Sequence, residues 1–181
     1  MAKCWPVFLL LCLGGCSSHP LLPTVARVDL QRFMGDWYVV AHIPAGKEAD
    51  AYNAVESYAL AADGRTIETT YAFRDGGFDG PVEVLRPNGV VRDRETNARW
   101  GMQFFWPFRF EYLITWLDAD YQTTIIGRSK RDYAWIMARR PDLAEAEYQE
   151  LVAELGRQGY DLSELRRVPQ RWPDPGHPTF R

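Results

Sequence analysis

The sequence predicts an all-β domain, either an antiparallel sandwich or a closed barrel, followed by one helix. Short runs rich in Val, Tyr and Thr recur along the chain, and turn-forming pairs such as Asp63-Gly64 and Asn88-Gly89 separate them. The chain has 181 residues, of which 46% are hydrophobic and 14% aromatic. This length and composition suit one globular domain whose core or pocket is built with aromatic rings.

The first fifteen residues are predicted to be a signal peptide. Lys3 provides a positive start, and the apolar run 7–13 is too short to span a bilayer. This run ends in Leu13-Gly14-Gly15-Cys16, which resembles a bacterial lipobox, where the cysteine is acylated after cleavage. Cys16 is therefore the predicted lipidation site, and several acyl chains would give stable membrane attachment. The alternative is an ordinary signal peptide whose small residues suit cleavage.

The remaining cysteines agree with this interpretation. Cys4 and Cys12 both lie in the leader, so cleavage leaves Cys16 without a partner for a disulfide within the chain. Ser17 follows Cys16, where lipoproteins of this kind that stay in the inner membrane carry Asp. The resemblance therefore implies an outer-membrane address.

Eight short strands are predicted after a proline-containing tether that covers residues 16–27. The predicted strands are 36–43, 54–61, 66–73, 81–85, 99–105, 112–117, 123–127 and 133–138. Their number and spacing favour antiparallel neighbours joined by tight turns.

One helix is predicted after the strands. Apolar residues between Ala144 and Leu155 recur at helical spacing after Pro141, and Gly156 or Gly159 can end the helix. Because the helix has a single apolar stripe, we expect it to pack on the outside of the sheet. The tail, residues 171–181, is proline-rich and is expected to be irregular.

Three short motifs resemble those of the lipocalin family. Residues 33–38 contain a Gly-x-Trp pattern, residues 117–121 resemble the family's Asp-Tyr turn, and residues 132–141 resemble its third motif. The match runs in order from 28 to 170, and together with the lipobox it is similar to bacterial outer-membrane lipoprotein lipocalins. The resemblance implies an eight-stranded antiparallel up-and-down β-barrel (lipocalin) with one C-terminal external α-helix over residues 28–170.

The resemblance also implies structural roles for the motif residues. Gly35 would allow a tight turn before the first strand, and Trp37 would close one end of the barrel. Arg139 would lie across the ring of Trp37 as a cation–π contact. Asp120 and Tyr121 belong to the second motif. These five residues are expected to hold the fold and not a ligand.

An eight-stranded barrel is just wide enough for one small ligand. This family branch implies a non-catalytic carrier of fatty acids or lysophospholipids, lipid-anchored to the outer membrane and facing the periplasm. Two alternatives stay open, a lipid-modifying enzyme on the same scaffold and a structural envelope lipoprotein with a ligand-free core. The net charge of −3 and the lack of a basic patch argue against nucleic acid as a partner.

Residues that could support catalysis or metal binding are few. The histidines are His19, His42 and His177; there is no nucleophile-elbow motif and no His/Cys cluster with metal-ligand spacing. Asp118 and Asp120 could touch a cation, but an Asp-rich hairpin turn is the favoured interpretation. The sequence therefore predicts no enzyme, no metal site and no cofactor.

Strand alternation predicts the lining of the pocket. If Trp37 and Arg139 face the interior, residues two, four or six positions away on their strands face it as well, and the family register extends this to the sixth and seventh strands. The predicted ligand-binding residues are Val39, Ala41, Tyr112, Ile114, Trp116, Ile125, Tyr133, Trp135 and Met137. The alternative is that these side chains simply fill the barrel.

The family motifs mark the closed end, so the connections at the opposite end should surround the mouth. One connection, residues 104–110, has five aromatic residues in seven, and another, residues 128–132, has three cations. This pattern suits a lipid whose chain enters the barrel and whose headgroup stays outside. The predicted portal residues are Trp106, Phe108, Arg109, Arg128, Lys130 and Arg131. The aromatic residues could instead form a homodimer contact, and the cations could be ordinary solvated turn residues.

Overall fold

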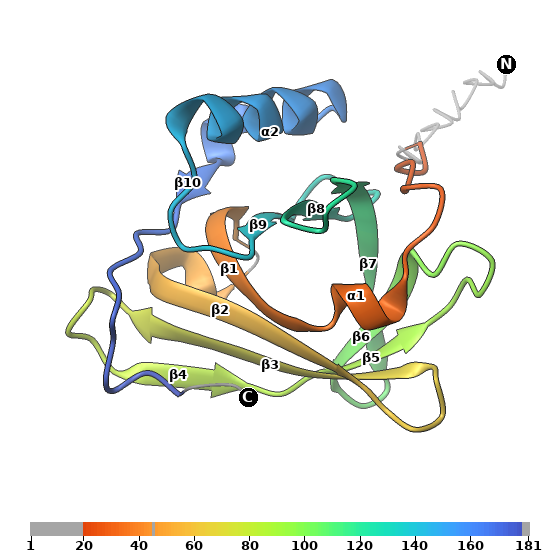
Figure 1. Cartoon of the computed structure of the whole chain (residues 1–181), viewed down its shortest axis with the longest axis horizontal. Helices are drawn as coiled ribbons and strands as arrows, with labels where there is room; N and C mark the ends of the chain where they lie inside the picture. The colour runs from red at the N-terminus through yellow and green to blue at the C-terminus, as the bar shows by residue number, and fades with distance from the viewer. Residues whose placement is uncertain (1–19, 45, 179–181) are drawn as a thin grey trace, which may run out of the picture.

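The computed structural model describes residues 20–44 and 46–178 (Figure 1). The predicted signal peptide, residues 1–15, and the predicted lipidation site, Cys16, lie outside the described residues.

The predicted barrel is confirmed. Nine strands form its wall, and β1 pairs with both β2 and β9, which closes the sheet. Both β4 and β5 pair antiparallel with β3, so together they act as one interrupted strand of the barrel. Counted in this way, the barrel has eight strands. The strands are Gly35–Ile43 (β1), Ala51–Leu60 (β2), Thr66–Asp75 (β3), Val82–Leu85 (β4), Asn88–Val91 (β5), Arg99–Phe105 (β6), Phe108–Leu117 (β7), Thr123–Gly127 (β8) and Ala134–Ala138 (β9).

Two predicted connections differ from the structure. Asn88-Gly89 was expected in a turn but starts β5, and the turn follows at Asp93, whose carboxylate accepts hydrogen bonds from the backbone N–H groups of Glu95 and Thr96. The connection 104–110 is mostly strand, because Phe105 and Phe108 pair across a tight hairpin. The composition of these two segments predicts loops, but Asn88-Gly89 and the rings of Phe105 and Phe108 belong to strands.

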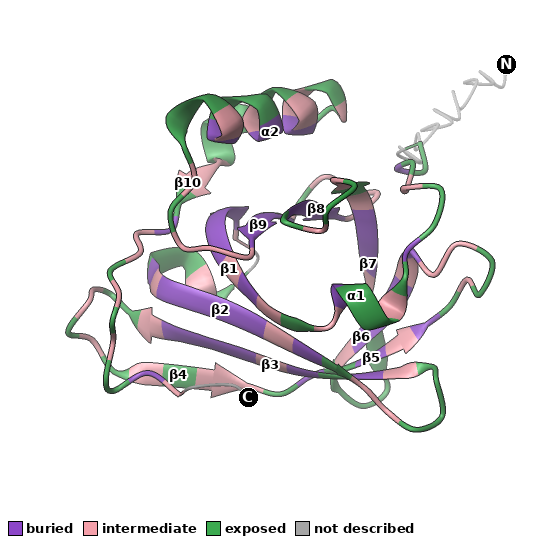
Figure 2. Ribbon diagram, in the orientation of Figure 1, coloured by how far each residue is buried: buried purple, intermediate pink, exposed green. Residues whose placement is uncertain are grey.

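The C-terminal helix, α2 (Glu145–Arg157), lies outside the barrel as expected (Figure 1). It buries Tyr148, Leu151 and Leu155 against the outer face of the wall, and the buried side of α2 faces the strands in Figure 2. A 3₁₀ turn, η2 (Leu162–Glu164), leads into a short strand, β10 (Arg166–Arg167), which pairs with the second half of β1.

The barrel therefore separates two apolar clusters. One fills the interior and includes Trp37, Tyr58 and Trp100. The other lies between the outer wall and α2 and includes Leu113, Ile125 and Ile136. A residue's cluster thus shows which way its side chain points, since neighbouring strand residues alternate between the two faces.

Residues 20–27, expected to belong to a tether, pack on the barrel instead. The Leu22 side chain is fully buried in the outer cluster, and its backbone N–H lies 3.3 Å from Ser129 Oγ. The Val25 N–H donates to the Ile114 carbonyl at 3.0 Å. Gly127 contributes to this packing, because a Cβ there would collide with the Tyr160 hydroxyl and approach the Leu22 side chain to 3.0 Å. The glycine leaves room for both side chains.

The tail is irregular over its described residues, 171–178, but it is fixed to the wall. Arg74 of β3 forms two hydrogen bonds with the carboxylate of Asp174, at 2.6 and 2.7 Å. Asn53 donates to the same carboxylate at 2.8 Å. The neighbouring cation and these hydrogen bonds hold the pKa of Asp174 well below its usual range.

Candidate functional site

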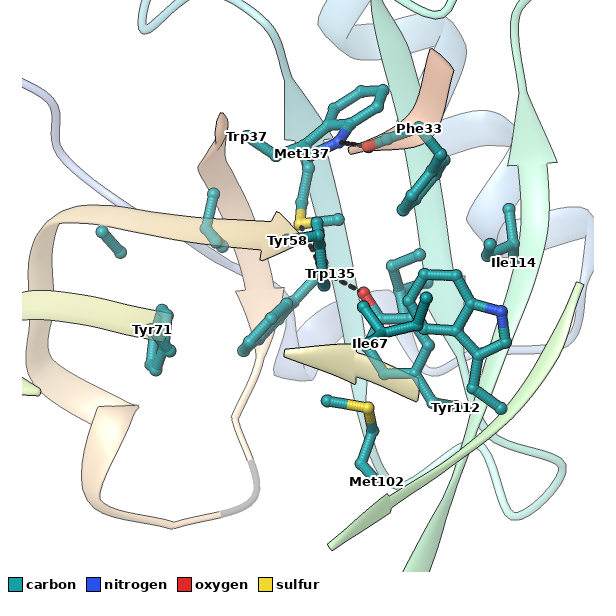
Figure 3. Packing of buried hydrophobic residues seen from close by; sticks show 14 of the residues in the cluster. Phe33, Trp37, Tyr58, Ile67, Tyr71, Met102, Tyr112, Ile114, Trp135 and Met137 are labelled. Carbon is teal, nitrogen blue, oxygen red and sulfur yellow. Dashed lines mark hydrogen bonds between the residues drawn. The ribbon is translucent and has the colours of Figure 1, made fainter. Parts of the chain in front are cut away.

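The first and third motifs meet at one end of the barrel. A short helix that the sequence did not predict, α1 (Leu30–Phe33), covers this end, and the Trp37 indole N–H donates to the Phe33 carbonyl at 2.8 Å (Figure 3). The Arg139 guanidinium lies 3.8 Å from the Trp37 ring centre. Gly35 has a φ of +91°, and a Cβ there would stand 3.4 Å from the guanidinium. The space would admit a Cβ, but this φ lies in the left-handed region that favours glycine, so glycine allows the turn into β1.

Arg139 also satisfies the backbone at this end. Its guanidinium donates to the carbonyls of Asp36, Arg32, Phe33 and Met34, at 2.8 to 3.1 Å. Burial lowers its pKa to about 10, so the group stays cationic at neutral pH. A desolvated cation–π contact contributes about 2 kcal/mol. Because the guanidinium also binds carbonyls of α1 and β1, Arg139 joins three segments: α1, β1 and the chain after β9.

The second motif is a hairpin turn. The Asp118 carboxylate accepts hydrogen bonds from the backbone N–H groups of Asp120, Gln122 and Thr123. Tyr121 has a φ of +60°, and its hydroxyl accepts from the N–H of Asp29 at 2.9 Å. Within the described residues, no three His, Cys, Asp or Glu side chains are placed to hold a metal ion.

Most of the predicted lining residues on β1, β7 and β9 lie inside. The pairs Val39–Met137 and Ile126–Trp135 stand opposite each other and belong to the interior cluster. The predicted residues found there, or packed against it, are Val39, Tyr112, Ile114, Tyr133, Trp135 and Met137.

Ala41, Trp116 and Ile125 do not point into the barrel, which corrects their predicted placement. The register of β1 shifts between Val39 and Ala41, and that of β7 shifts between Ile114 and Trp116. One extra residue in a strand reverses the face of every residue beyond it. Ala41 therefore packs under α2, and Trp116 is 38% exposed.

Ile125 has a different reason for its outward position. It stands opposite Ile136 on β9, and both belong to the outer cluster, whereas Ile126 takes the inward position. The register carried over for β8 was thus wrong by one residue.

The same bulge in β1 turns His42 inward, opposite Trp135. Its side chain is fully buried, and neither ring nitrogen has a hydrogen-bond partner. Burial and the nearby Arg166 cation lower the pKa of His42 to about 4. The imidazole is neutral at physiological pH.

The half of the barrel nearest α1 is filled with rings. Trp100 stacks on Tyr112 with ring centres 5.3 Å apart, and Phe33 contacts Trp37, Tyr58 and Trp100. The Tyr58 and Tyr112 hydroxyls are hydrogen-bonded to each other (Figure 3). These rings form the floor above which the barrel is hollow.

The hollow half contains a cavity of about 560 Å³. Its wall includes the predicted residues Tyr112, Tyr133 and Trp135, together with Tyr71 and Met102, which the prediction missed. Its outer rim comes from the β1–β2 connection, which includes η1 (Lys47–Asp50), from the break between β4 and β5, and from the β6–β7 hairpin and the β8–β9 connection. The rim residues are Gly46, Lys47, Glu48, Leu85, Arg86, Pro87, Phe104, Phe105, Phe110, Glu111 and Arg128.

The cavity also has a buried acid that the sequence analysis did not single out. Glu56 of β2 is 1% exposed and stands opposite Trp37 and Tyr71, whose side chains are in the interior. Burial raises the pKa of Glu56 well above its usual range. The available signal was its spacing, because Glu56 shares strand parity with the apolar residues Ala54 and Tyr58.

The structure brings one of the six predicted portal residues to the cavity. Arg128 lines the cavity, where it pairs with Asp132 at 3.3 Å and lies near the rings of Phe110 and Tyr133. Trp106 and Phe108 are 86% and 59% exposed at the hairpin, outside the cavity wall.

The other three predicted cations do not line the cavity. The Arg131 guanidinium donates to the Gln158 carbonyl at 3.2 Å and to the carbonyls of Pro20 and Ser129, so it ties chain segments together. Arg109 lies on the side of β7 that faces Gly101, away from the ring positions Phe110 and Tyr112. Lys130 is exposed.

None of the helices in the described part of the chain is long and apolar enough to cross a membrane.

The chain is similar in sequence to a named lipocalin and to a bacterial outer membrane lipoprotein. The chain is 26% identical over 158 residues to temperature-induced lipocalin-1 of Arabidopsis thaliana, with 82% of this chain and 83% of that protein covered. It is 28% identical over 159 residues to the outer membrane lipoprotein Blc of Escherichia coli K12, with 86% and 88% covered.

Solved structures show the same fold at lower identity. Insecticyanin from the tobacco hornworm Manduca sexta matches with a TM-score of 0.64 and 15% identity, over 83% of this chain and 85% of that chain. Lobster apocrustacyanin A1 matches with a TM-score of 0.62 and 12% identity, over 84% and 92%. The family model described as a lipocalin-like domain matches residues 28–170. The chain therefore belongs to the lipocalin family.

Proposed function

We propose that this protein carries one apolar ligand, a fatty acid or lysophospholipid, in the hollow half of its barrel at the bacterial outer membrane. Lipocalins bind small hydrophobic ligands, and the observation that carries the proposal is the cavity of about 560 Å³. Its size lies within the usual range of small-molecule sites. Seven aromatic residues, Met102 and Leu85 are among the residues that line the cavity, which suits an alkyl chain.

The experiment that tests the carrier function is mass spectrometry of lipid extracted from protein purified without detergent. A fatty acid or lysophospholipid in stoichiometric amount supports the proposal. If no lipid is recovered and the purified protein does not bind the fluorescent fatty acid cis-parinaric acid, the barrel is a structural element. Release of product from a lysophospholipid would instead indicate the enzyme alternative.

Two tryptophans offer a matched pair for locating the site. Trp135 lines the cavity, whereas Trp116 is on the outer face of the neighbouring wall. Trp135→Ala should change the affinity for cis-parinaric acid by about tenfold, and Trp116→Ala should leave it within twofold. Equal effects of the two substitutions would contradict a ligand site inside the barrel.

The proposed membrane attachment rests on the lipobox at Cys16 and on the name of the bacterial relatives, outer membrane lipoprotein Blc. Pro20 lies at the β8–β9 connection, where its carbonyl accepts from Arg131. Three residues separate Cys16 from Pro20, and the four chain steps between the two reach at most about 14 Å. An acyl anchor on Cys16 would therefore keep the mouth of the barrel close to the bilayer.

Cell fractionation tests the anchor. A Cys16→Ser variant should be recovered as soluble or uncleaved protein, because the acyl chains can no longer be attached at residue 16. Recovery of a processed Cys16→Ser chain with outer membranes would contradict lipidation as the means of attachment.

A further inference from the structure

The inner end of the cavity carries polar atoms that have no partner in the protein. Glu56 Oε2, the Tyr71 hydroxyl and Trp135 Nε1 are all buried and unpartnered. All three residues line the cavity. A buried polar atom without a hydrogen bond destabilises the folded protein, so three at one place need an explanation.

The three side chains are neighbours. Glu56 and Tyr71 stand directly opposite each other on β2 and β3, where Cβ atoms are about 5 Å apart. The rings of Tyr71 and Trp135 have their centres 4.8 Å apart. Figure 3 shows Tyr71 and Trp135 among the interior side chains, away from the ring floor at Trp37. One small ligand group can therefore reach all three.

The chemistry of the three groups limits what can satisfy them. The indole N–H of Trp135 can only donate, so the ligand must offer an acceptor. The hydroxyl of Tyr71 can donate or accept. Burial raises the pKa of Glu56 and thereby favours its neutral form. A neutral carboxyl offers one donor and one acceptor. An ammonium group has no acceptor and would leave the indole unsatisfied.

We propose that Glu56, Tyr71 and Trp135 form a binding site for a neutral hydroxyl group at the buried end of an apolar ligand. This inference rests on the proposed carrier function and gives the ligand's orientation and chemical class. The hydroxyl donates to Glu56 or Tyr71 and accepts from Trp135. The hydroxyl supplies the hydrogen-bond partners that these buried atoms lack, which a plain alkyl end cannot do.

The cavity rim supports the same orientation. Lys47, Glu48, Arg86, Glu111 and Arg128 surround the outer part, so formal charges of both signs stand at the rim. Apart from Glu56, no Asp, Glu, Lys or Arg lies among the buried residues of the described chain. A ligand with one charged and one hydroxylated end would place the charge at the rim and the hydroxyl inside.

The test compares 1-decanol with 1-methoxydecane, which has the same oxygen but no donor, and with decylammonium. Each compound displaces the uncharged dye N-phenyl-1-naphthylamine from the full chain. We expect 1-decanol to bind about tenfold more tightly than the ether, as one added hydrogen bond predicts. Decylammonium should bind more weakly than the alcohol.

Variants of Glu56 complete the test, and thermal unfolding checks that each is folded. Glu56→Gln keeps a donor and an acceptor and should keep the preference for the alcohol. Glu56→Leu should bring the ratio of the affinities for 1-decanol and 1-methoxydecane close to one. Tyr71→Phe should lower this affinity ratio about threefold, and it replaces Glu56→Leu in the test if that variant does not fold. Equal binding of alcohol and ether by the natural chain overturns the hydroxyl site, as does tighter binding of decylammonium. Failure of the dye itself to bind would overturn the carrier function.

Discussion

At the closed end of the barrel, Arg139 donates to four carbonyls within 3.1 Å, whereas the hollow half keeps Glu56, Tyr71 and Trp135 with unpartnered atoms. Both regions belong to one continuous sheet and both are buried. Natural proteins pair almost all of their buried polar groups. The contrast teaches that the closed end is built for stability, and that the hollow half gives up stability where a ligand group can enter.

The sharpest way to test this contrast is to remove Arg139. Arg139→Ala leaves the carbonyls around α1 without their donor and exposes the face of Trp37, so the free energy of unfolding should fall by about 4 kcal/mol. Urea denaturation of the purified protein measures the loss. The adjacent Arg140 provides the control, because it pairs with Glu147 in a partly exposed position and its removal should cost less than about 1 kcal/mol. Equal losses would contradict a special role of the closed end.

The hollow half should respond to pH through His42. The unfolded chain binds a proton near pH 6.5, but the folded chain does so only near pH 4. The free energy of unfolding should therefore decrease as the pH falls from about 6.5 to about 4, by about 3 kcal/mol in total. A His42→Leu variant should lack this part of the pH dependence. An unchanged slope in that variant would show that His42 is not held neutral by burial.

Sequence alternation predicted the interior where a strand is regular. On β9, Trp135 and Met137 point inward, because five residues pair with β8 without a shift, and Tyr133, just before the strand, packs against the same interior cluster. It failed for Ala41 and Trp116, since a bulge leaves no mark in the hydrophobic pattern of a strand that is buried on both faces. The family motifs placed Trp37 and Arg139 together, which alternation alone does not do.

Loop composition was a weaker guide to the site. Arg128 and Arg131 look alike in the sequence, but their contacts differ. One partner of Arg131 is the Gln158 carbonyl, 27 residues further along the chain. Such a contact depends on where α2 ends. Glu56 was open to prediction from its parity with Ala54 and Tyr58, because a single acid in a run of inward positions breaks the apolar pattern.

The two arginines of the β8–β9 connection sharpen the comparison on a smaller scale. Arg131→Ser should lower the free energy of unfolding by about 1–2 kcal/mol, because it removes hydrogen bonds to the carbonyls of Pro20, Ser129 and Gln158. Arg128→Ser should change stability by less than about 0.5 kcal/mol but weaken cis-parinaric acid about threefold relative to the uncharged dye. If Arg128→Ser instead lowered stability and Arg131→Ser weakened the fatty acid, the result would contradict a contact between Arg128 and the ligand headgroup.

The smallest effect on stability is expected at the tip of the β6–β7 hairpin. Trp106 and Phe108 are 86% and 59% exposed and make few contacts that folding could use, so replacing both with Ser should change the free energy of unfolding by less than about 0.5 kcal/mol.

If this tip touches the bilayer beside the anchor, the same double substitution in a Cys16→Ser chain should reduce binding to phosphatidylglycerol vesicles about tenfold. The loss of each ring would remove roughly 1 kcal/mol or more of the binding free energy that comes from burying it in the membrane interface. Trp116→Ser is the matched control, because that ring is exposed on the wall and away from the tip. Vesicle flotation measures the bound fraction. If the tip and control variants bind equally well, the rings serve another contact, and analytical ultracentrifugation of the two variants would then show whether that contact is a homodimer.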